Sequence, residues 1–348
     1  MTHRHRIRTM PRIRPRARVL LAGAVTVVVL VALCGLALSL GDEPTTPAAL
    51  WEALHRRGPE NTVYAVVEVR LPRVAMAVIV GAAFGIAGGL SQSVLRNPLA
   101  SPDVLGVAAG ASVGAVLVIS AGALGGPIGL VPIPVAALAG GFGAAGLIAM
   151  FAVDRSFRGR RILLVGIAIS MALTGVTQYL LTRIDVYDAQ RSAAWLTGSL
   201  NARDWQDAVP VAVGLCVLVP VILVLGHSSR ALIFGDDLVS AWGVAAGRVR
   251  VVLLVCAVCL AALATAAAGP VAFVALVAGQ ASRRAARVPD IPPLLAGMTG
   301  ALIVLAADTV ARTVLPVQLP VGVLTALVGA PYLLYVLQRR RGRKGQTL

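Results

Sequence analysis

The sequence predicts an all-α, polytopic transmembrane bundle of about ten helices, with both termini on the cytoplasmic side. Of its 348 residues, 58% are hydrophobic and only 13% are charged. A soluble domain of this length would carry about twice that charged fraction. The charged residues also gather between long uncharged runs, which is typical of a chain that crosses a membrane repeatedly.

Ten apolar runs account for the predicted helices, and most approach the roughly 20 residues that a bilayer core requires. The run 270–281 is short for a full crossing, and Gly269-Pro270 separates it from its predecessor, with proline where a first helical turn tolerates it. In chain order the runs are 19–40, 74–95, 104–122, 133–153, 162–182, 208–226, 250–268, 270–281, 294–313 and 321–338.

The distribution of positive charge predicts the orientation. With ten crossings, 23 of the 31 lysines and arginines fall on the side of the two termini, and eight fall on the other. The positive-inside rule therefore places the basic tails 1–18 and 339–348 in the cytoplasm and the transmembrane domain 19–338 between them in the cell membrane. The net charge of +16 is clustered between apolar runs with few aromatic residues, so no nucleic-acid partner is expected.

The first apolar run, 19–40, is interpreted as an uncleaved helix. It is too long for the hydrophobic region of a signal peptide, and no small-x-small cleavage site follows it.

Glycines recur at four-residue spacing in two of the runs. On a helix this spacing forms a stripe where another backbone can approach closely. The predicted packing stripes are Gly81, Gly85 and Gly89 in the first run, and Gly106, Gly110 and Gly114 in the second. Small residues also pack generic helical bundles, so the stripes alone do not identify a family.

Several motifs together resemble the FecCD-type permeases, the membrane subunits of binding-protein-dependent ABC importers for iron–siderophores, haem and cobalamin. They are Arg70-Leu-Pro-Arg73, then Arg96-Asn97-Pro98-Leu-Ala, then the run that starts at Gly269-Pro270 and reaches Arg283, then Leu-Pro320-Val-Gly322, and finally Gly-Ala-Pro331.

The resemblance implies a permease subunit that moves its substrate inward with ATP hydrolysed by a separate subunit. The implied partners are a second permease, identical or paralogous, two ATPase subunits, an extracytoplasmic substrate-binding protein and the lipid bilayer. A ferric siderophore is the expected substrate, with haem or cobalamin as alternatives. No cofactor is expected on this chain, and it lacks the Walker A pattern that would bind a nucleotide.

The resemblance also implies a docking site on the outer face. There Arg70, Arg73 and Arg312 would face acidic residues of the binding protein, since a guanidinium pairs bidentately with a carboxylate. The alternatives are snorkelling to the headgroups or, for Arg312, an i,i+4 ion pair with Asp308.

The cytoplasmic stretch 227–249 resembles the coupling helices that contact the ATPase. A helix start at Gly235-Asp236-Asp237 is favoured by carboxylates at its positive end. The expected ATPase contacts are Asp236, Asp237, Leu238, Ala241 and Gly243. An interfacial loop on the headgroups is the alternative.

Three positions depart from the family pattern. Gly279 and Gln280 stand where the family has Pro-His, although Arg283 is retained, and Gln318 replaces a glutamate. Trp195 also fits a family pattern, and a membrane-interface tryptophan explains it equally well.

No catalytic or metal-binding residues are predicted. Cys256-Ala-Val-Cys259 has no second Cys or His pair nearby. A self-contained secondary transporter or channel is the alternative function, and it predicts ionisable residues at mid-membrane. Asp308 is the only acidic residue within a predicted span, and it lies near the outer end. An intramembrane enzyme ranks third.

Overall fold

A computed structural model describes residues 15–41, 44–123, 125–152, 159–231, 246–314 and 318–344. These residues form helices and no β-strand. All ten predicted runs coincide with helices, which confirms the predicted fold class. The helices are α1 (Pro15–Ser39), α4 (Leu71–Val94), α5 (Val107–Ala123), α6 (Ile133–Ala152), α7 (Gly159–Leu181), α9 (Trp205–Ala231), α11 (Ala246–Ala268), α12 (Val274–Ala286), α13 (Pro293–Thr313) and α14 (Val321–Lys344).

Seven helices among the described residues are long and apolar enough to cross a membrane. The apolar helices Val107–Ala123 and Val321–Leu333 are shorter. With 13 residues, α12 is about 20 Å long, which is shorter than a bilayer core of about 30 Å. This length agrees with the prediction that the run 270–281 is short for a full crossing.

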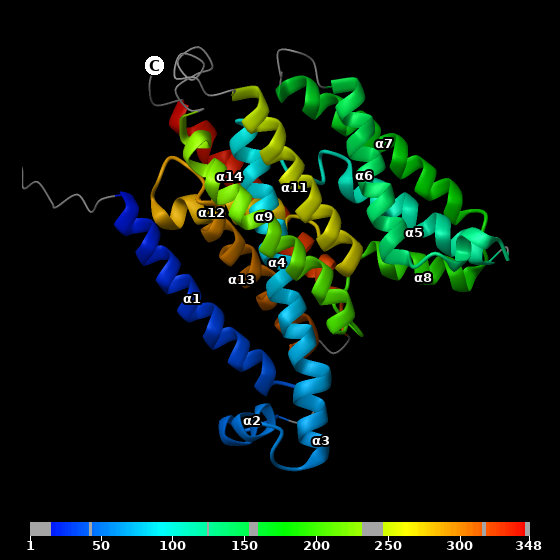
Figure 1. Ribbon diagram of the computed structural model, residues 1–348, viewed down its shortest axis with the longest axis vertical. Coiled ribbons are helices and arrows are strands. Elements are labelled where there is room, and N and C mark those ends of the chain that lie inside the picture. Colours follow the sequence, from blue (N-terminus) through cyan, green and yellow to red (C-terminus); the bar gives the residue numbers. More distant parts are fainter. Residues whose placement is uncertain are drawn as a thin grey trace, which may run out of the picture.

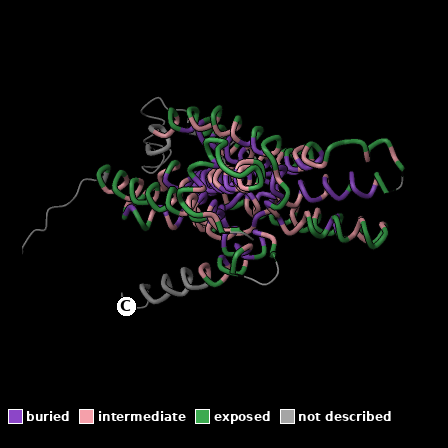
Figure 2. Tube along the Cα trace, turned by 90° about the horizontal axis from the view of Figure 1, so that it is seen from below, coloured by how far each residue is buried: buried purple, intermediate pink, exposed green. Residues whose placement is uncertain are grey.

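The helix α4 forms the centre of the bundle, with α9, α11, α12 and α13 packed around it (Figure 1). Buried residues concentrate at the centre of this bundle (Figure 2). On its outer side α4 continues from α3 (Glu60–Val63) and the π-helix η1 (Tyr64–Arg70), so the helical stretch Glu60–Val94 has 35 residues. It is about 50 Å long and extends beyond the bilayer core, where α2 (Pro47–Leu54) packs beside it.

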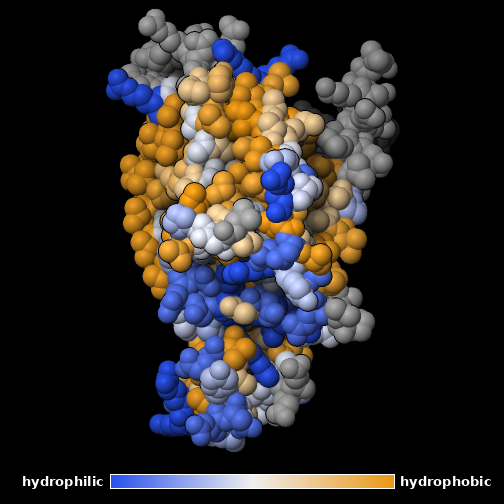
Figure 3. Space-filling view, turned by 90° about the vertical axis from the view of Figure 1, so that its right-hand side faces the viewer, coloured by the Kyte–Doolittle hydropathy of each residue, from blue (hydrophilic) through white to orange (hydrophobic). Residues whose placement is uncertain are grey.

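A second group, α5, α6 and α7, lies to one side of α4 and is joined to it by α11. The helix α8 (Val186–Leu196) contacts α5, and the 3-10 turn η2 (Pro127–Leu130) connects α5 to α6. Figure 3 shows this side of the molecule as a broad hydrophobic surface above a hydrophilic outer end. The hydrophobic surface is the part that lipid would cover.

The structure adds helices that the sequence analysis did not predict, α2 and α8 among them. Both have side-chain N-caps, since Thr46 Oγ1 accepts from the Ala49 amide and Asp185 Oδ1 from the Asp188 amide. These caps were visible in the sequence as Thr-Pro and Asp-x-x-Asp patterns. Two helices extend beyond the predicted apolar runs, because α1 begins at Pro15 and α14 continues to Lys344. Glutamine, arginine and lysine are good helix formers, so α14 continues past its apolar run.

Candidate functional site

The predicted docking arginines lie together at the outer end of α4 and α13. The carboxylate of Asp308 accepts from Arg73, with Nη2 to Oδ1 at 2.8 Å and Nε to Oδ2 at 3.0 Å. Arg312 Nε lies 3.8 Å from Asp308 Oδ2, which is the i,i+4 ion pair expected as an alternative to docking. The exposed side-chain fractions are 2% for Asp308, 9% for Arg312 and 16% for Arg73. The carboxylate is therefore buried between two guanidinium groups.

The other donors of these arginines hold the end of α1. Arg70 Nη1 donates to the Leu38 carbonyl and to Thr45 Oγ1, both at 3.0 Å. Arg312 Nη1 donates to the Leu40 carbonyl at 3.1 Å, and its Nη2 donates to the Ala37 carbonyl. The last carbonyls of a helix have no intrahelical donor, and they form the negative end of its dipole. Two arginines thus cap α1, which attaches the first helix to α4 and α13.

The cluster, defined here as Arg70, Arg73, Arg312 and Asp308, combines three guanidinium groups with one carboxylate. Arg73 Nη1 also reaches Asn201 Oδ1, at 3.1 Å, in the loop between α8 and α9. The cluster thus joins four segments on the outer face. Contact of these arginines with a partner stays a prediction.

The first glycine stripe lies against α13. A Cβ on Gly81 would meet Gly300 O at 2.5 Å and Ala301 Cα at 2.7 Å, and one on Gly85 would meet the backbone of Ala296. A Cβ on Gly89 would lie 3.0 Å from Ile291 Cγ2. The two helices are therefore in backbone contact, as glycine stripes allow.

The second stripe lies against α6, although its first member precedes α5. Cβ atoms on Gly110 and Gly114 would meet the carbonyl oxygens of Gly140 and Ala136. Gly106 precedes α5 and has φ +77°, a conformation that side chains rarely adopt. Its assignment to a helical stripe is corrected on this point, because Gly106 belongs to the turn, where it faces Ile148 and Ser170.

The Arg96-Asn97-Pro98 motif is a helix stop. Arg96 has φ +49°, and the Asn97 amide donates to the Gln92 carbonyl at 3.2 Å, the long bond of a Schellman motif. Asn97 Oδ1 then accepts from the Leu99 amide at 3.0 Å, and Pro98 cannot continue a helix. In the same inner turn, burial raises the pKa of Asp103 to about 6.

A buried chain of polar side chains links α4 to α12 near the retained Arg283. Gln92 Nε2 donates to the Leu276 carbonyl at 2.9 Å, Gln280 Nε2 donates to Gln92 Oε1 at 2.7 Å, and Arg283 Nη2 donates to Gln280 Oε1 at 3.0 Å. A Cβ at Gly279 would lie 2.7 Å from Gln92 Oε1. The two residues that depart from the family pattern thus act together, since Gly279 leaves room for the amide that Gln280 contacts.

The remaining motif residues meet where three chain segments come together on the outer side of α12. The Ser199 amide donates to the Ala268 carbonyl at 2.8 Å, and the Gly322 amide donates to the Gly198 carbonyl at 3.2 Å. Pro270 O lies 3.2 Å from a Cβ built on Gly322. Pro320 precedes α14, and its carbonyl accepts from the Val323 amide at 3.1 Å.

The predicted ATPase contacts lie outside the described residues. These are Asp236, Asp237, Leu238, Ala241 and Gly243, in the unassigned stretch 232–245. No group of His, Cys, Asp or Glu that could hold a metal ion occurs in the part of the chain that the structure describes.

The fold and the two polar clusters define a multi-pass α-helical protein of the cytoplasmic membrane, built around a glycine-packed central helix. A profile of the FecCD transport family matches residues 28–339. The chain belongs to this family.

Its relatives include two ferric citrate permeases. The Fe(3+) dicitrate transport system permease protein FecD of Escherichia coli (strain K12) is 37% identical, over 91% of this chain and 99% of the relative. The Fe(3+)-citrate import system permease protein YfmE of Bacillus subtilis (strain 168) is 33% identical, over 93% of this chain and 97% of the relative. A solved inward-facing structure of a metal-chelate type ABC transporter has a TM-score of 0.79 over 92% of this chain and 99% of that chain. At 24% identity it shows a shared fold.

Proposed function

We propose that this chain is the non-catalytic membrane subunit of a binding-protein-dependent ABC importer for a ferric chelate. It would pair with a second permease subunit, identical or paralogous, and with two ATPase subunits that bind and hydrolyse ATP. Family membership over residues 28–339 is the observation that carries this proposal. Ferric siderophores, with ferric citrate first because both relatives above are named for it, are the proposed substrates.

The placement of buried charge favours this function over a secondary transporter. Among the described residues, the buried charged side chains are Arg250, four residues into α11, and Asp308, five residues before the end of α13. The Asp308 carboxylate is bonded to Arg73 and paired with Arg312 near the end of α13, so it lies away from mid-membrane. An ion-coupled carrier needs a titratable group near mid-membrane.

The outer arginine cluster is the proposed docking site for the binding protein. Its guanidinium groups would form charge-assisted hydrogen bonds with carboxylates of the partner. Since Arg70 and Arg312 also cap α1, a docking test has to remove charge and keep hydrogen-bond donors. Arg70→Gln with Arg312→Gln meets that condition.

We expect this double variant to weaken binding-protein association about tenfold or more, because charge-assisted contacts contribute about 1.5–3 kcal/mol each. The matched control is Arg56→Gln with Arg57→Gln, an equal charge change in the outer segment between α2 and α3. Equal loss of affinity in both double variants would attribute docking to general electrostatics and would reject the cluster as the site.

Two measurements test the function itself. Co-purification from native membranes should recover an ATPase, a binding protein and any second permease. In proteoliposomes with those partners, uptake of iron-55 citrate should require ATP, and haem or cobalamin should not compete. Uptake by this chain alone, driven by an ion gradient without ATP, would show that it is a secondary transporter.

Coupling to the ATPase is assigned to residues 227–249. Replacing Asp237 by Lys together with Gly243 by Pro should leave membrane insertion intact and abolish substrate-stimulated ATP hydrolysis. Unchanged stimulation would exclude this segment from the coupling path.

A further inference from the structure

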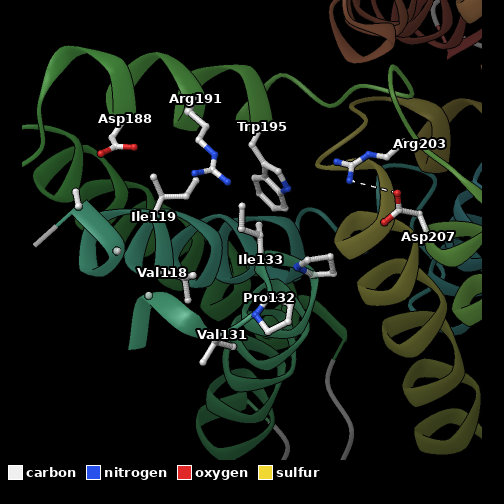
Figure 4. Close-up of a pocket in the computed structure, with 14 residues that line it drawn as sticks. Val118, Ile119, Val131, Pro132, Ile133, Asp188, Arg191, Trp195, Arg203 and Asp207 are labelled. Carbon is white, nitrogen blue, oxygen red and sulfur yellow. Dashed lines mark ion pairs between the residues drawn. The ribbon is translucent and has the colours of Figure 1, made fainter. Parts of the chain in front are cut away.

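A pocket of about 670 Å³ lies beneath α8 on the outer side of the molecule (Figure 4). One wall is apolar and consists of Val118 and Ile119 from α5, followed by Val131, Pro132 and Ile133 at the start of α6. The opposite wall is the face of α8 that carries Asp188, Arg191 and Trp195. The pocket therefore has one hydrophobic and one charged side.

The charged wall carries two opposite charges without protein partners. Asp188, Arg191 and Trp195 follow at i, i+3 and i+7 spacing and project from α8 toward α5 (Figure 4). Across the pocket, Arg203 and Asp207 pair with each other at 3.6 Å. Within the described part of the chain, the side chains of Asp188 and Arg191 make no ion pair or hydrogen bond, even with each other. Both charges are thus available to a ligand.

The apolar wall is continuous with surface that faces outward from the bundle. The turn η2 exposes 52% of Ile128 and 87% of Leu130, and α6 exposes 53% of Val135. These residues sit where α5 ends and α6 begins, at the outer ends of two membrane helices. Exposed aliphatic side chains at this level contact acyl chains, whereas arginine and tryptophan there contact headgroups. A ligand that spans both walls must be amphipathic.

We propose that this pocket binds a phosphatidylethanolamine molecule of the outer leaflet. The phosphate lies at Arg191, since a guanidinium presents several donors to phosphate oxygens. The ammonium lies at Asp188 and donates to its carboxylate. One acyl chain follows Val118, Val131 and Ile133. The charges of Asp188 and Arg191 cancel, so the site complements a zwitterion. The choline headgroup has no N–H to donate, so the site discriminates against phosphatidylcholine.

Lipid retention by the purified full-length chain tests the site. The chain is reconstituted in nanodiscs with equal amounts of phosphatidylethanolamine, phosphatidylcholine and phosphatidylglycerol, released into detergent and analysed by native mass spectrometry. Each headgroup contact is a charge-assisted hydrogen bond, so we expect phosphatidylethanolamine to be enriched about tenfold over either other lipid. Arg191→Gln and Asp188→Asn should each remove most of that enrichment.

The matched control is Arg183→Gln, on the same outer face but outside the pocket, where Arg183 lies over the Tyr179 ring at 5.9 Å. It should retain the lipid as the wild type does, and circular dichroism should show equal helix content in all variants.

Equal occupancy by the three lipids overturns the proposal. So does preference for phosphatidylglycerol that Asp188→Asn leaves unchanged, because simple attraction of anions to arginine then explains it. Displacement of the lipid by soluble ferric citrate would identify an aqueous ligand and also overturn it. Lipid retention needs neither ATPase nor binding protein, so its failure is separate from failure of the proposed function.

Discussion

Replacing Gly81 by alanine tests the backbone contact between α4 and α13. The new Cβ would lie 2.5 Å from Gly300 O, 2.7 Å from Ala301 Cα and 2.8 Å from Gly300 C, where ordinary contacts begin at 3.4 Å. All three are main-chain atoms of a helix and cannot rotate away. The two helices must therefore separate locally by about 0.6–0.9 Å, a gap that forfeits a quarter to a half of each dispersion contact along the crossing.

The expected cost follows from these distances. Overpacking costs about 1–3 kcal/mol, and backbone contacts on three atoms favour the upper end of that range. Alanine gains about 1 kcal/mol over glycine in helix propensity. The net loss should be about 2 kcal/mol, or about 30-fold in the unfolding equilibrium. Reversible unfolding in mixed SDS micelles, followed by circular dichroism, measures it.

Gly143→Ala in α6 is the matched control for this substitution. It is also a helical glycine, and a Cβ there meets no atom within 4 Å. Its free energy of unfolding should be unchanged or should rise by up to about 1 kcal/mol. If Gly81→Ala is as stable as Gly143→Ala, the helices are not in backbone contact in the membrane, and the argument from glycine spacing fails.

Three further predictions concern buried polar groups. Gln92→Leu or Gln280→Leu alone should lower the free energy of unfolding by about 1–2 kcal/mol, because the remaining amide stays buried without its partner. In the same unfolding assay the double variant should lose less than the sum of the two single losses. Strictly additive losses would contradict the pairing. Asp308→Asn should lower the free energy of unfolding by about 3 kcal/mol, because it leaves two arginines without a counter-charge, and adding Arg73→Gln should restore part of that stability. A further loss of stability in the double variant would argue against the ion pair. Burial raises the pKa of Asp103 from 3.8 to about 6, so the folded state is penalised where this carboxyl is ionised, and stability should fall as pH rises from 4 through 6. Asp103→Asn should remove that part of the pH dependence, and a profile parallel to the wild type would refute it.

The membrane helices were predictable because each depends on an uninterrupted apolar run, a property local in sequence. The glycine contacts were predictable as stripes for the same reason, since four-residue spacing fixes one helical face. Gly106 was assigned wrongly because spacing does not reveal that α5 begins one residue later. The caps at Thr46 and Asp185 were local signals too, and they predict α2 and α8 once the outer loops are searched for them.

The outer arginine cluster was predictable only in part. Family resemblance selected Arg70, Arg73 and Arg312, and the i,i+4 spacing of Asp308 and Arg312 indicated their pairing. The bonds to α1 were not visible, because Arg70 reaches the Leu38 carbonyl across 32 positions and Arg312 reaches Leu40 across 272. Main-chain carbonyls leave no signature in a sequence. Their role as acceptors depends on where α1 ends beside α4 and α13.

Gly279 and Gln280, which depart from the family pattern, form one arrangement with Gln92 of α4. The partner of Gln280 is Gln92, 188 positions away on α4, so the sequence of α12 alone gives no reason for the amide. A buried glutamine without a partner would be costly in a membrane protein. Here Gln280 donates to Gln92, Gln92 donates to the Leu276 carbonyl, and the Gln280 oxygen accepts from Arg283, which removes that cost. The absence of a side chain at Gly279 is part of the same arrangement, because a Cβ there would fill the space of the Gln92 side-chain oxygen. Substituting proline at 279 and histidine at 280 should therefore destabilise the packing of α12 on α4 unless Gln92 is changed as well.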